Sequence, residues 1–94
     1  MSKHIGSTLD DFLDKEGLLA EAEAIAVKRV IAYQLGEMME SQGLSRTELA
    51  RRMKTSRASL DRLLDPENAS VTLLTLERAA RALGMRVKIE LDAA

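Results

Sequence analysis

The sequence predicts a mainly α-helical domain that ends in one β-strand. With 94 residues, the chain has the length of a single domain around one hydrophobic core. Apolar residues recur at helical spacing along most of the chain, between short groups of turn-forming residues. Only residues 85–91 change to the two-residue period of a strand. We therefore expect a flexible acidic segment over residues 1–17 and one folded domain over residues 18–94.

The composition argues against several classes of function. The chain has no cysteine, which excludes disulfides, zinc-finger ligation and thiol catalysis. Phe12 and Tyr33 are its only aromatic residues, too few for the stacking platforms that hold single-stranded nucleic acid. No apolar run approaches the ~18 residues of a membrane span, and the first residues lack the apolar core of a signal peptide. We expect a soluble, cytoplasmic protein with no cofactor, metal or membrane partner.

One long helix is predicted from Leu18 to Gln42, where no proline interrupts the pattern, and Gly43 is expected to end it. Before it, residues 9–17 are expected to form one or two acidic helical turns, and residues 1–8 are expected to be mobile. Residues 9–17 carry three apolar residues, Leu9, Phe12 and Leu13, which are expected to anchor a basic protein partner within an acidic rim. The apolar stripe of the long helix consists of Leu19, Ala22, Ala26, Val30, Ile31, Leu35, Met38 and Met39.

Two short helices are predicted next from their capping residues. Ser45 with Glu48 forms the pattern of a capping box, so the first short helix should begin at Ser45 and end near Lys54. Residues 55–56 are Thr and Ser, which can cap a second helix over residues 57–64. The following Asp-Pro pair should end that helix.

A fourth helix and a strand complete the predicted fold. Thr72 is the expected cap of the helix and Gly84 its end, with a buried stripe of Leu73, Leu76, Ala80 and Leu83. In residues 85–91, the apolar residues alternate with charged ones, which predicts a strand. A lone strand leaves its backbone groups unpaired, so we expect it to pair with its own copy in a homodimer.

Positive charge is concentrated in the two short helices. Residues 45–64 hold six basic and two acidic side chains, although the whole chain has a formal net charge of −1. Residues 1–24 are the opposite, with six acidic and two basic side chains. Because the basic residues are local, they favour a local contact with DNA within an otherwise acidic protein.

Two short capped helices joined by about three residues match a helix-turn-helix. Ala50 is small where the two helices would cross, and Leu49, Met53, Leu60 and Leu63 are expected to face inward. The second helix can then enter a major groove about 12 Å wide. The residues expected to contact DNA are Arg46, Thr55, Ser56, Arg57, Ala58, Ser59, Asp61 and Arg62.

The expected roles within this set differ. Arg57 is the predicted base-reading residue, and Arg46 is the predicted phosphate contact at a helix start. Two roles are open for Asp61, which can accept a hydrogen bond from a cytosine amine or orient Arg57. Three further basic residues either touch DNA or form a solvated helix face, and these are Arg51, Arg52 and Lys54.

The motif resembles the Xre-type, lambda-repressor-like helix-turn-helix in Leu49-Ala50, Met53, Thr55-Ser56-Arg57, Leu60 and Leu63. Together with the acidic DDFL segment and the long helix, the layout after residue 5 is similar to that of HigA-like antitoxins. This resemblance implies a dimer that binds its own operator and neutralises a small RelE-like ribonuclease toxin. Two-fold symmetry further predicts a palindromic operator. Lys54 departs from the family, which often has Gly in the turn.

Two other functions compete with the antitoxin: a free-standing repressor of the same fold, and a protein-interaction adaptor that does not bind DNA. The acidic N-terminal segment favours the antitoxin, because a ribonuclease must be basic to hold RNA. Hydroxyl groups and Arg57 on the second short helix favour DNA binding over the adaptor. An enzyme is not expected, since the chain has a lone His4, no nucleophile–base pair and no glycine-rich phosphate loop.

Overall fold

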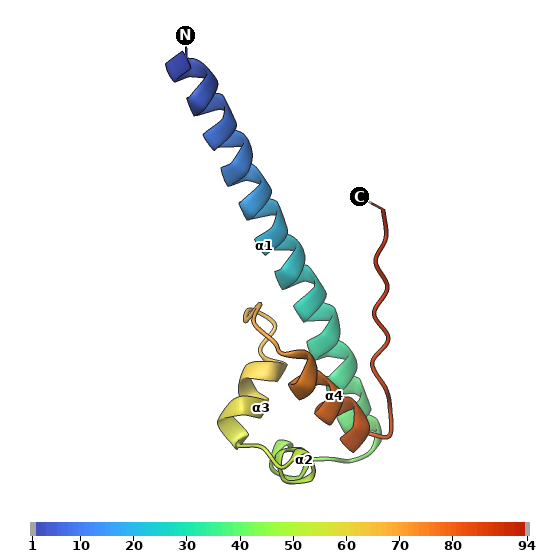
Figure 1. Ribbon diagram of the computed structural model, residues 1–94. Helices are drawn as coiled ribbons and strands as arrows, with labels where there is room; N and C mark the ends of the chain where they lie inside the picture. The colour runs from blue at the N-terminus through green and yellow to red at the C-terminus, as the bar shows by residue number, and fades with distance from the viewer. Residues whose placement is uncertain (1, 94) are drawn as a thin grey trace.

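The computed structural model describes residues 2–93, with side chains described for residues 14–93. The protein is built from four helices (Figure 1). Helix α1 packs against α3, and α2 packs against both α3 and α4. The predicted mainly helical fold is therefore confirmed. The bounds of the helices are Ser2–Ser41 for α1, Arg46–Met53 for α2, Arg57–Leu64 for α3 and Leu73–Ala82 for α4.

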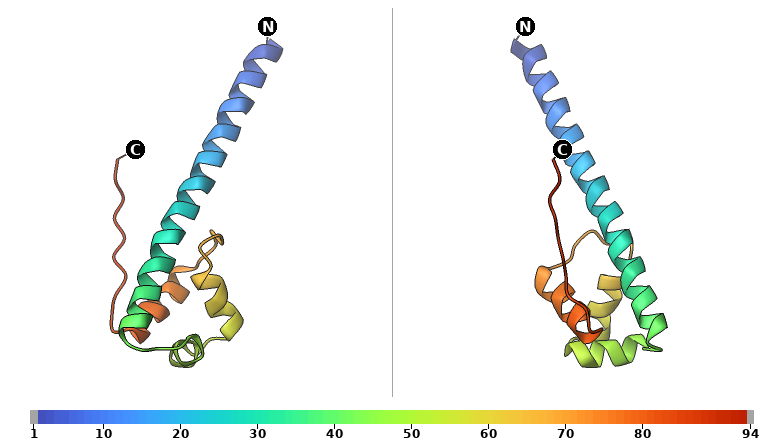
Figure 2. Two further views of the ribbon diagram at one scale, coloured as in Figure 1. Left: turned by 180° about the vertical axis from the view of Figure 1, so that it is seen from behind. Right: turned by 90° about the vertical axis from the view of Figure 1, so that its right-hand side faces the viewer.

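Helix α1 is longer than the sequence pattern predicted. The predicted start at Leu18 is wrong, because the backbone is helical from Ser2 onward. The 40 residues of α1 span about 60 Å, and its first half projects away from the other helices (Figures 1 and 2). Once a helix has formed, each added residue contributes a backbone hydrogen bond, so α1 continues past the end of its apolar stripe. Among residues 2–93, no helix is long and apolar enough to cross a membrane.

Three N-terminal predictions are not tested by the structure. The side chains of Leu9, Phe12 and Leu13 are not among the described ones, so their predicted role as an apolar anchor stays a prediction. The same holds for the predicted mobility of residues 1–8 and for the division of the chain at residue 17.

Only the C-terminal part of the predicted α1 stripe is buried. Leu35 and Met39 lie in the core, and Ile31 packs against it. By contrast, Leu19 is 60% exposed and Val30 is 55% exposed. Leu19 is exposed because the other three helices cover only the last part of α1. Val30 lies within the covered part but is on the opposite side of the helix from the buried Lys28, so it faces solvent.

A single core lies where the C-terminal part of α1 meets α2, α3 and α4. All four predicted inward-facing residues of the two short helices are buried, and Ala50 is 5% exposed. Leu73 is the exception in the predicted α4 stripe, since it is 66% exposed and Ala79 is fully buried instead. The core residues are Leu35, Met39, Leu49, Ala50, Met53, Leu60, Leu63, Leu64, Leu76, Ala79 and Leu83.

The predicted strand over residues 85–91 is not formed in the single chain. After Gly84, which has a positive φ of 75°, the chain is extended and runs back beside α1 (Figures 1 and 2). A strand is defined by hydrogen bonds to a neighbouring strand, and residues 2–93 contain no other extended segment that pairs with this one. Residues 85–91 therefore have the alternating apolar and charged residues of a strand, but not the hydrogen bonds to a neighbouring strand.

Candidate nucleic-acid interface

The turn between α2 and α3 consists of residues 54–56. Lys54 is in the left-handed conformation with φ 56° and ψ 45°. Its N–H donates to the carbonyl of Arg51 at 3.1 Å, and the N–H of Thr55 donates to the carbonyl of Ala50 at 3.0 Å. Such a turn favours glycine, and a side chain there costs about 1 kcal/mol. The predicted three-residue connection is thus confirmed, with Lys54 as its strained residue.

Ser45 caps α2 as predicted, and of the two residues that the sequence offered as the cap of α3, Thr55 and Ser56, the cap is Ser56. The N–H of Glu48 donates to Ser45 Oγ at 3.1 Å, and the N–H of Ser59 donates to Ser56 Oγ at 3.0 Å. The returning half of the predicted capping box is not formed. Instead, the Glu48 carboxylate accepts hydrogen bonds from Arg51 and Arg52, and the bond from Arg51 is the main reason that the pKa of Glu48 is lowered.

Helix α3 presents one face to the core and the other to solvent. Leu60, Leu63 and Leu64 are buried against the rest of the domain. Of the predicted DNA contacts on this helix, Arg57, Ala58 and Arg62 are exposed, and Ser59 and Asp61 are half-buried. The predicted recognition helix therefore has an open face along its whole length.

Three of the predicted contacts meet in one charged cluster. Asp61 Oδ1 accepts a hydrogen bond from Arg46 Nη1 at 2.9 Å and another from Arg57 Nε at 3.1 Å. Arg57 Nη1 also donates to Thr47 Oγ1 at 3.1 Å. The hydrogen bond from Arg46, followed by that from Arg57, holds the pKa of Asp61 below its ordinary value of 3.8. One carboxylate thus joins the first residue of α2 to the first residue of α3.

The remaining predicted contacts lie outside this cluster. Ser59 and Arg62 line a shallow depression with residues 68–72. Thr55 lies half-buried in the turn, and the hydroxyl of Ser56 serves as the helix cap. Arg51 and Arg52 are exposed and paired with Glu48 in the free protein.

Sequence reasoning missed two residues that hold this surface in place. Thr47 gives no distinguishing signal in the sequence, yet it accepts a hydrogen bond from Arg57. Lys28 is 2% exposed and donates to three carbonyl oxygens at the end of α3 and in the loop after it, those of Arg62, Asp65 and Asn68. A signal for Lys28 was present, because it is one turn from Ile31 and two turns from Leu35 on the buried stripe.

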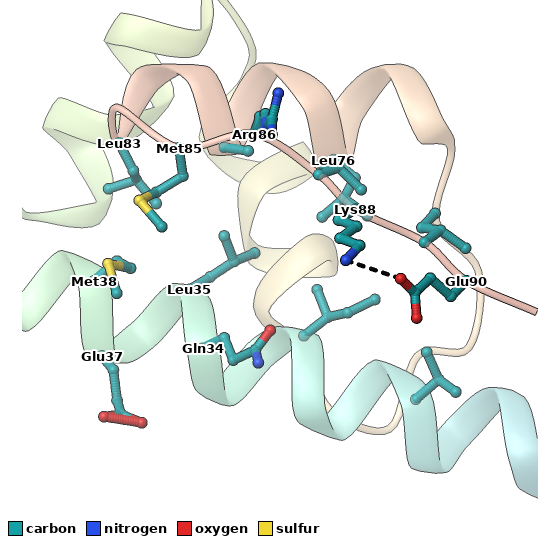
Figure 3. A pocket seen from close by; sticks show the side chains of 15 residues that line it. Gln34, Leu35, Glu37, Met38, Leu76, Leu83, Met85, Arg86, Lys88 and Glu90 are labelled. Atoms are coloured by element: carbon teal, nitrogen blue, oxygen red, sulfur yellow. Dashed lines mark ion pairs between the residues drawn. The ribbon is translucent and has the colours of Figure 1, made fainter.

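A second feature is an apolar groove of about 560 Å³ between α1, α4 and the C-terminal segment (Figure 3). Val87 packs against the core on one side of this groove, whereas Ile89 and Leu91 are 62% and 96% exposed. Lys88 and Glu90 form an ion pair at 2.8 Å along its edge (Figure 3). The residues from α1 and α4 that line it include Val27, Ile31, Leu35, Met38, Leu76, Ala80 and Leu83.

The described side chains do not form a metal site. Among residues 14–93, no group of three or more His, Cys, Asp or Glu side chains is arranged to hold a metal ion. The charged groups around α3 are instead the arginines and carboxylates described above.

Two capped helices, a tight three-residue turn and an open second helix define a helix-turn-helix DNA-binding domain. Residues 34–88 match the Cro/C1-type helix-turn-helix DNA-binding domain family, and this match covers more than half of the chain. The protein belongs to that family, which fits the predicted Xre-type resemblance. Comparison with curated proteins gives no match, and comparison with solved structures gives none either.

Proposed function

We propose that the protein is a transcriptional repressor that recognises double-stranded DNA in a sequence-specific manner, with α3 in the major groove. The observation that supports this most is the Arg46–Asp61–Arg57 cluster, because it places two guanidinium groups at the adjoining starts of α2 and α3. Helix starts also offer free backbone N–H groups to phosphate oxygens. In this proposal Arg57 contacts a guanine base, Arg46 contacts a phosphate, and the exposed Ser56 lies near the sugar-phosphate backbone of the DNA.

The two arginines have different expected effects on binding. Arg57→Ala should lose about 1–3 kcal/mol of discrimination between the operator and random DNA, as expected for a lost bidentate contact to guanine. Arg46→Ala should weaken binding to operator and to random DNA about equally. It should also reduce the slope of log binding constant against log salt concentration by about one unit. Gel-shift titrations at several salt concentrations measure both effects. Equal operator affinity of Arg57→Ala and wild type would remove Arg57 from the base-reading role.

We further propose that this repressor is the antitoxin of a type II toxin–antitoxin pair and neutralises a small, basic, RelE-like ribonuclease in the manner of HigA-like proteins. The supporting observation is the first half of α1, which projects away from the other helices (Figures 1 and 2). Leu18 and Leu19 on this part are 66% and 60% exposed. Around them stand four carboxylates and one lysine, at Asp14, Lys15, Glu16, Glu21 and Glu23.

An apolar pair within an acidic helix fits a basic partner, because the leucines supply buried area and the carboxylates supply complementary charge. The test is co-expression with the product of the neighbouring reading frame. Wild type should protect cells from a basic ribonuclease encoded there, whereas Leu18→Ser/Leu19→Ser and deletion of residues 1–17 should not protect. Both variants should retain operator binding.

The alternative is a free-standing repressor of the same fold. It would use the same α3 surface, and the exposed leucines of α1 would then have no toxin to contact. A neighbouring gene that encodes no small basic protein, together with full operator repression by the protein alone, would favour this alternative. Unchanged protection by both α1 variants would place the toxin-binding surface elsewhere on the chain.

The proposed repressor acts as a two-fold homodimer. Support comes from the apolar groove and from the extended segment beside it, in which Ile89 and Leu91 continue the apolar face of Val87 into solvent. Antiparallel pairing of residues 85–91 with the same residues of a second copy would satisfy the free backbone groups. A two-fold dimer would place two α3 helices one DNA turn, roughly 34 Å, apart on a palindromic operator.

A further inference from the structure

We infer that Asp61 is a positioning residue for base recognition, which sets the donors that Arg57 presents to DNA. This inference rests on the proposed DNA-binding function. It decides between the two roles that the sequence leaves open for Asp61, direct reading of a cytosine or orientation of Arg57.

The hydrogen bonds of the cluster determine which donors of Arg57 are available. A guanidinium group carries five N–H donors, one on Nε and two on each terminal nitrogen. Arg57 Nε donates to Asp61 Oδ1, and one donor of Nη1 is directed at Thr47 Oγ1. The donors left are the second one on Nη1 and both on Nη2. Two of these remaining donors can bind the paired O6 and N7 acceptors of guanine.

The same geometry favours the positioning role over a direct contact between Asp61 and a base. Asp61 Oδ1 already accepts two hydrogen bonds from positively charged groups, at 2.9 Å and 3.1 Å. A cytosine amine is a neutral donor and forms a weaker hydrogen bond with a carboxylate than a guanidinium does. In addition, Asp61 is one turn after Arg57 on α3, the spacing at which the two side chains lie on the same helix face.

The cluster orients the Arg57 side chain and contributes little to the stability of the fold. The side chains of Arg46, Arg57 and Asp61 are 47%, 53% and 45% exposed, and ion pairs of such exposure contribute little to folding. An arginine already held in one rotamer loses less conformational freedom on binding than a free one. Asp61 also carries a negative charge, which weakens non-specific attraction to phosphates. Both effects raise the ratio of specific to non-specific affinity.

The experiment selects preferred duplexes from a random pool with the full-length protein. Four proteins are compared: wild type, Asp61→Ala, Arg57→Ala and the double variant. Asp61→Ala and Arg57→Ala should relax the preference at the same base pair, with about a tenfold loss of specificity ratio for Asp61→Ala. In the Arg57→Ala background, Asp61→Ala should cause no further loss of discrimination. Asp61→Glu, which keeps the carboxylate, should restore part of the preference in an otherwise wild-type chain.

Two controls separate positioning from other effects. Glu77→Ala on α4 removes a carboxylate of similar exposure, 41%, that pairs with Arg81. It should raise affinity for random DNA without changing any base preference. Thermal melting of each variant shows whether it is folded at the temperature of the binding assay.

The outcomes distinguish this inference from the proposed function. Relaxed preference at a different base pair from that of Arg57→Ala, or a full Asp61→Ala effect in the absence of Arg57, overturns the positioning role and assigns direct reading to Asp61. Wild-type protein that enriches no sequence overturns the proposed sequence-specific function itself, and the positioning role with it.

Discussion

The Nζ atom of Lys28 lies 2.8 Å from the carbonyl oxygen of Asn68, although the two residues are 40 positions apart in the chain. The same ammonium group donates to the carbonyls of Arg62 and Asp65 at 3.0 Å and 3.2 Å. These carbonyls belong to the end of α3 and the loop after it. Two of them also accept a backbone N–H: the carbonyl of Arg62 from Asp65 at 3.3 Å, and that of Asp65 from Asn68 at 3.2 Å. Lys28 supplies the further donor that the end of a helix lacks. A cation at this end also complements the helix dipole. Lys28, a residue of α1, thus caps the C-terminal end of the recognition helix α3.

Removal of the Lys28 ammonium should destabilise the domain substantially. Lys28→Met keeps much of the side-chain volume, but it removes the donor to the carbonyl of Asn68 and the second donor to those of Arg62 and Asp65 in a part-buried site, at a cost of about 1–3 kcal/mol. The measurement is urea unfolding at one fixed protein concentration, since dimer formation would add to the apparent stability. Arg29→Ala is the matched control, because it breaks an exposed ion pair to Glu67 in the same loop. Equal losses in the two variants would contradict the capping role.

The contribution of Lys28 to the free energy of unfolding should change with pH in the alkaline range. Burial lowers the pKa of Lys28 from its ordinary value of 10.5, and the charge of Asp65 opposes this in part. Between the lowered pKa and 10.5, the unfolded chain therefore holds more protons than the folded one, so the free energy of unfolding rises with pH in this window. Above it, the dependence should be flat. Lys28→Met should lack this rise.

Urea unfolding of wild type and Lys28→Met at pH values from about 8 to about 11 tests this directly. Other titrating groups, including Tyr33, contribute equally to both proteins and cancel in the difference. The stability advantage of wild type should grow across the window. An advantage that shrinks with rising pH would mean that the three carbonyls favour the charged ammonium more than burial disfavours it.

Local signals predicted α2, α3 and their turn well, because each has a capping serine and a break within a few residues. The predicted extent of α3, from residue 57 to about residue 64, agrees with its observed bounds. Ser45 is the expected cap of α2, and Ser56 is one of the two residues expected to cap α3. The extent of burial was less predictable. Leu19 and Leu35 have the same helical pattern, but burial requires a neighbour, and the sequence does not show that α2–α4 cover only one end of α1.

The other features that the sequence did not predict depend on contacts between residues far apart in the chain. The position of Lys28 on the buried stripe was visible in the sequence, but its role was not, because its three acceptors are 34 to 40 residues away. The Arg46–Asp61 contact spans 15 residues and depends on the crossing of two helices. The predicted strand of residues 85–91 is not formed in the single chain for a related reason, since no other extended segment within residues 2–93 pairs with it.

Lys54 should limit the stability of the helix-turn-helix through its backbone alone. Its φ of 56° strains a residue with a side chain, so Lys54→Gly should stabilise the domain by up to about 1 kcal/mol. Lys54→Ala is the control, because it removes the charge but keeps the β-carbon, and it should give no such gain. Thermal or urea unfolding measures both. If both variants also bind operator DNA like wild type, Lys54 belongs to the solvated surface, whereas equal weakening of both assigns it a phosphate contact.

The dimer proposal makes a specific prediction for the extended C-terminal segment. Ile89 is 62% exposed in the single chain, so neither of its substitutions should disturb the core. Ile89→Pro removes a backbone donor and fixes φ, which prevents pairing with a second copy. Ile89→Ala keeps the donor and loses only the side chain. We expect monomers for the proline variant and dimers, weakened in proportion to the lost apolar area, for the alanine variant.

Sedimentation at micromolar concentration distinguishes these outcomes, and operator titrations extend the test to function. A monomer presents one α3 helix to a palindromic site, so Ile89→Pro should lose most of its operator affinity and its dependence on half-site spacing. Binding of Ile89→Pro to a single half-site should match that of wild type, because α3 and the Arg46–Asp61–Arg57 cluster are distant from residue 89 in the sequence and belong to other elements. A wild-type monomer, or a dimeric proline variant, would exclude strand pairing and leave the groove beside α1 without this occupant.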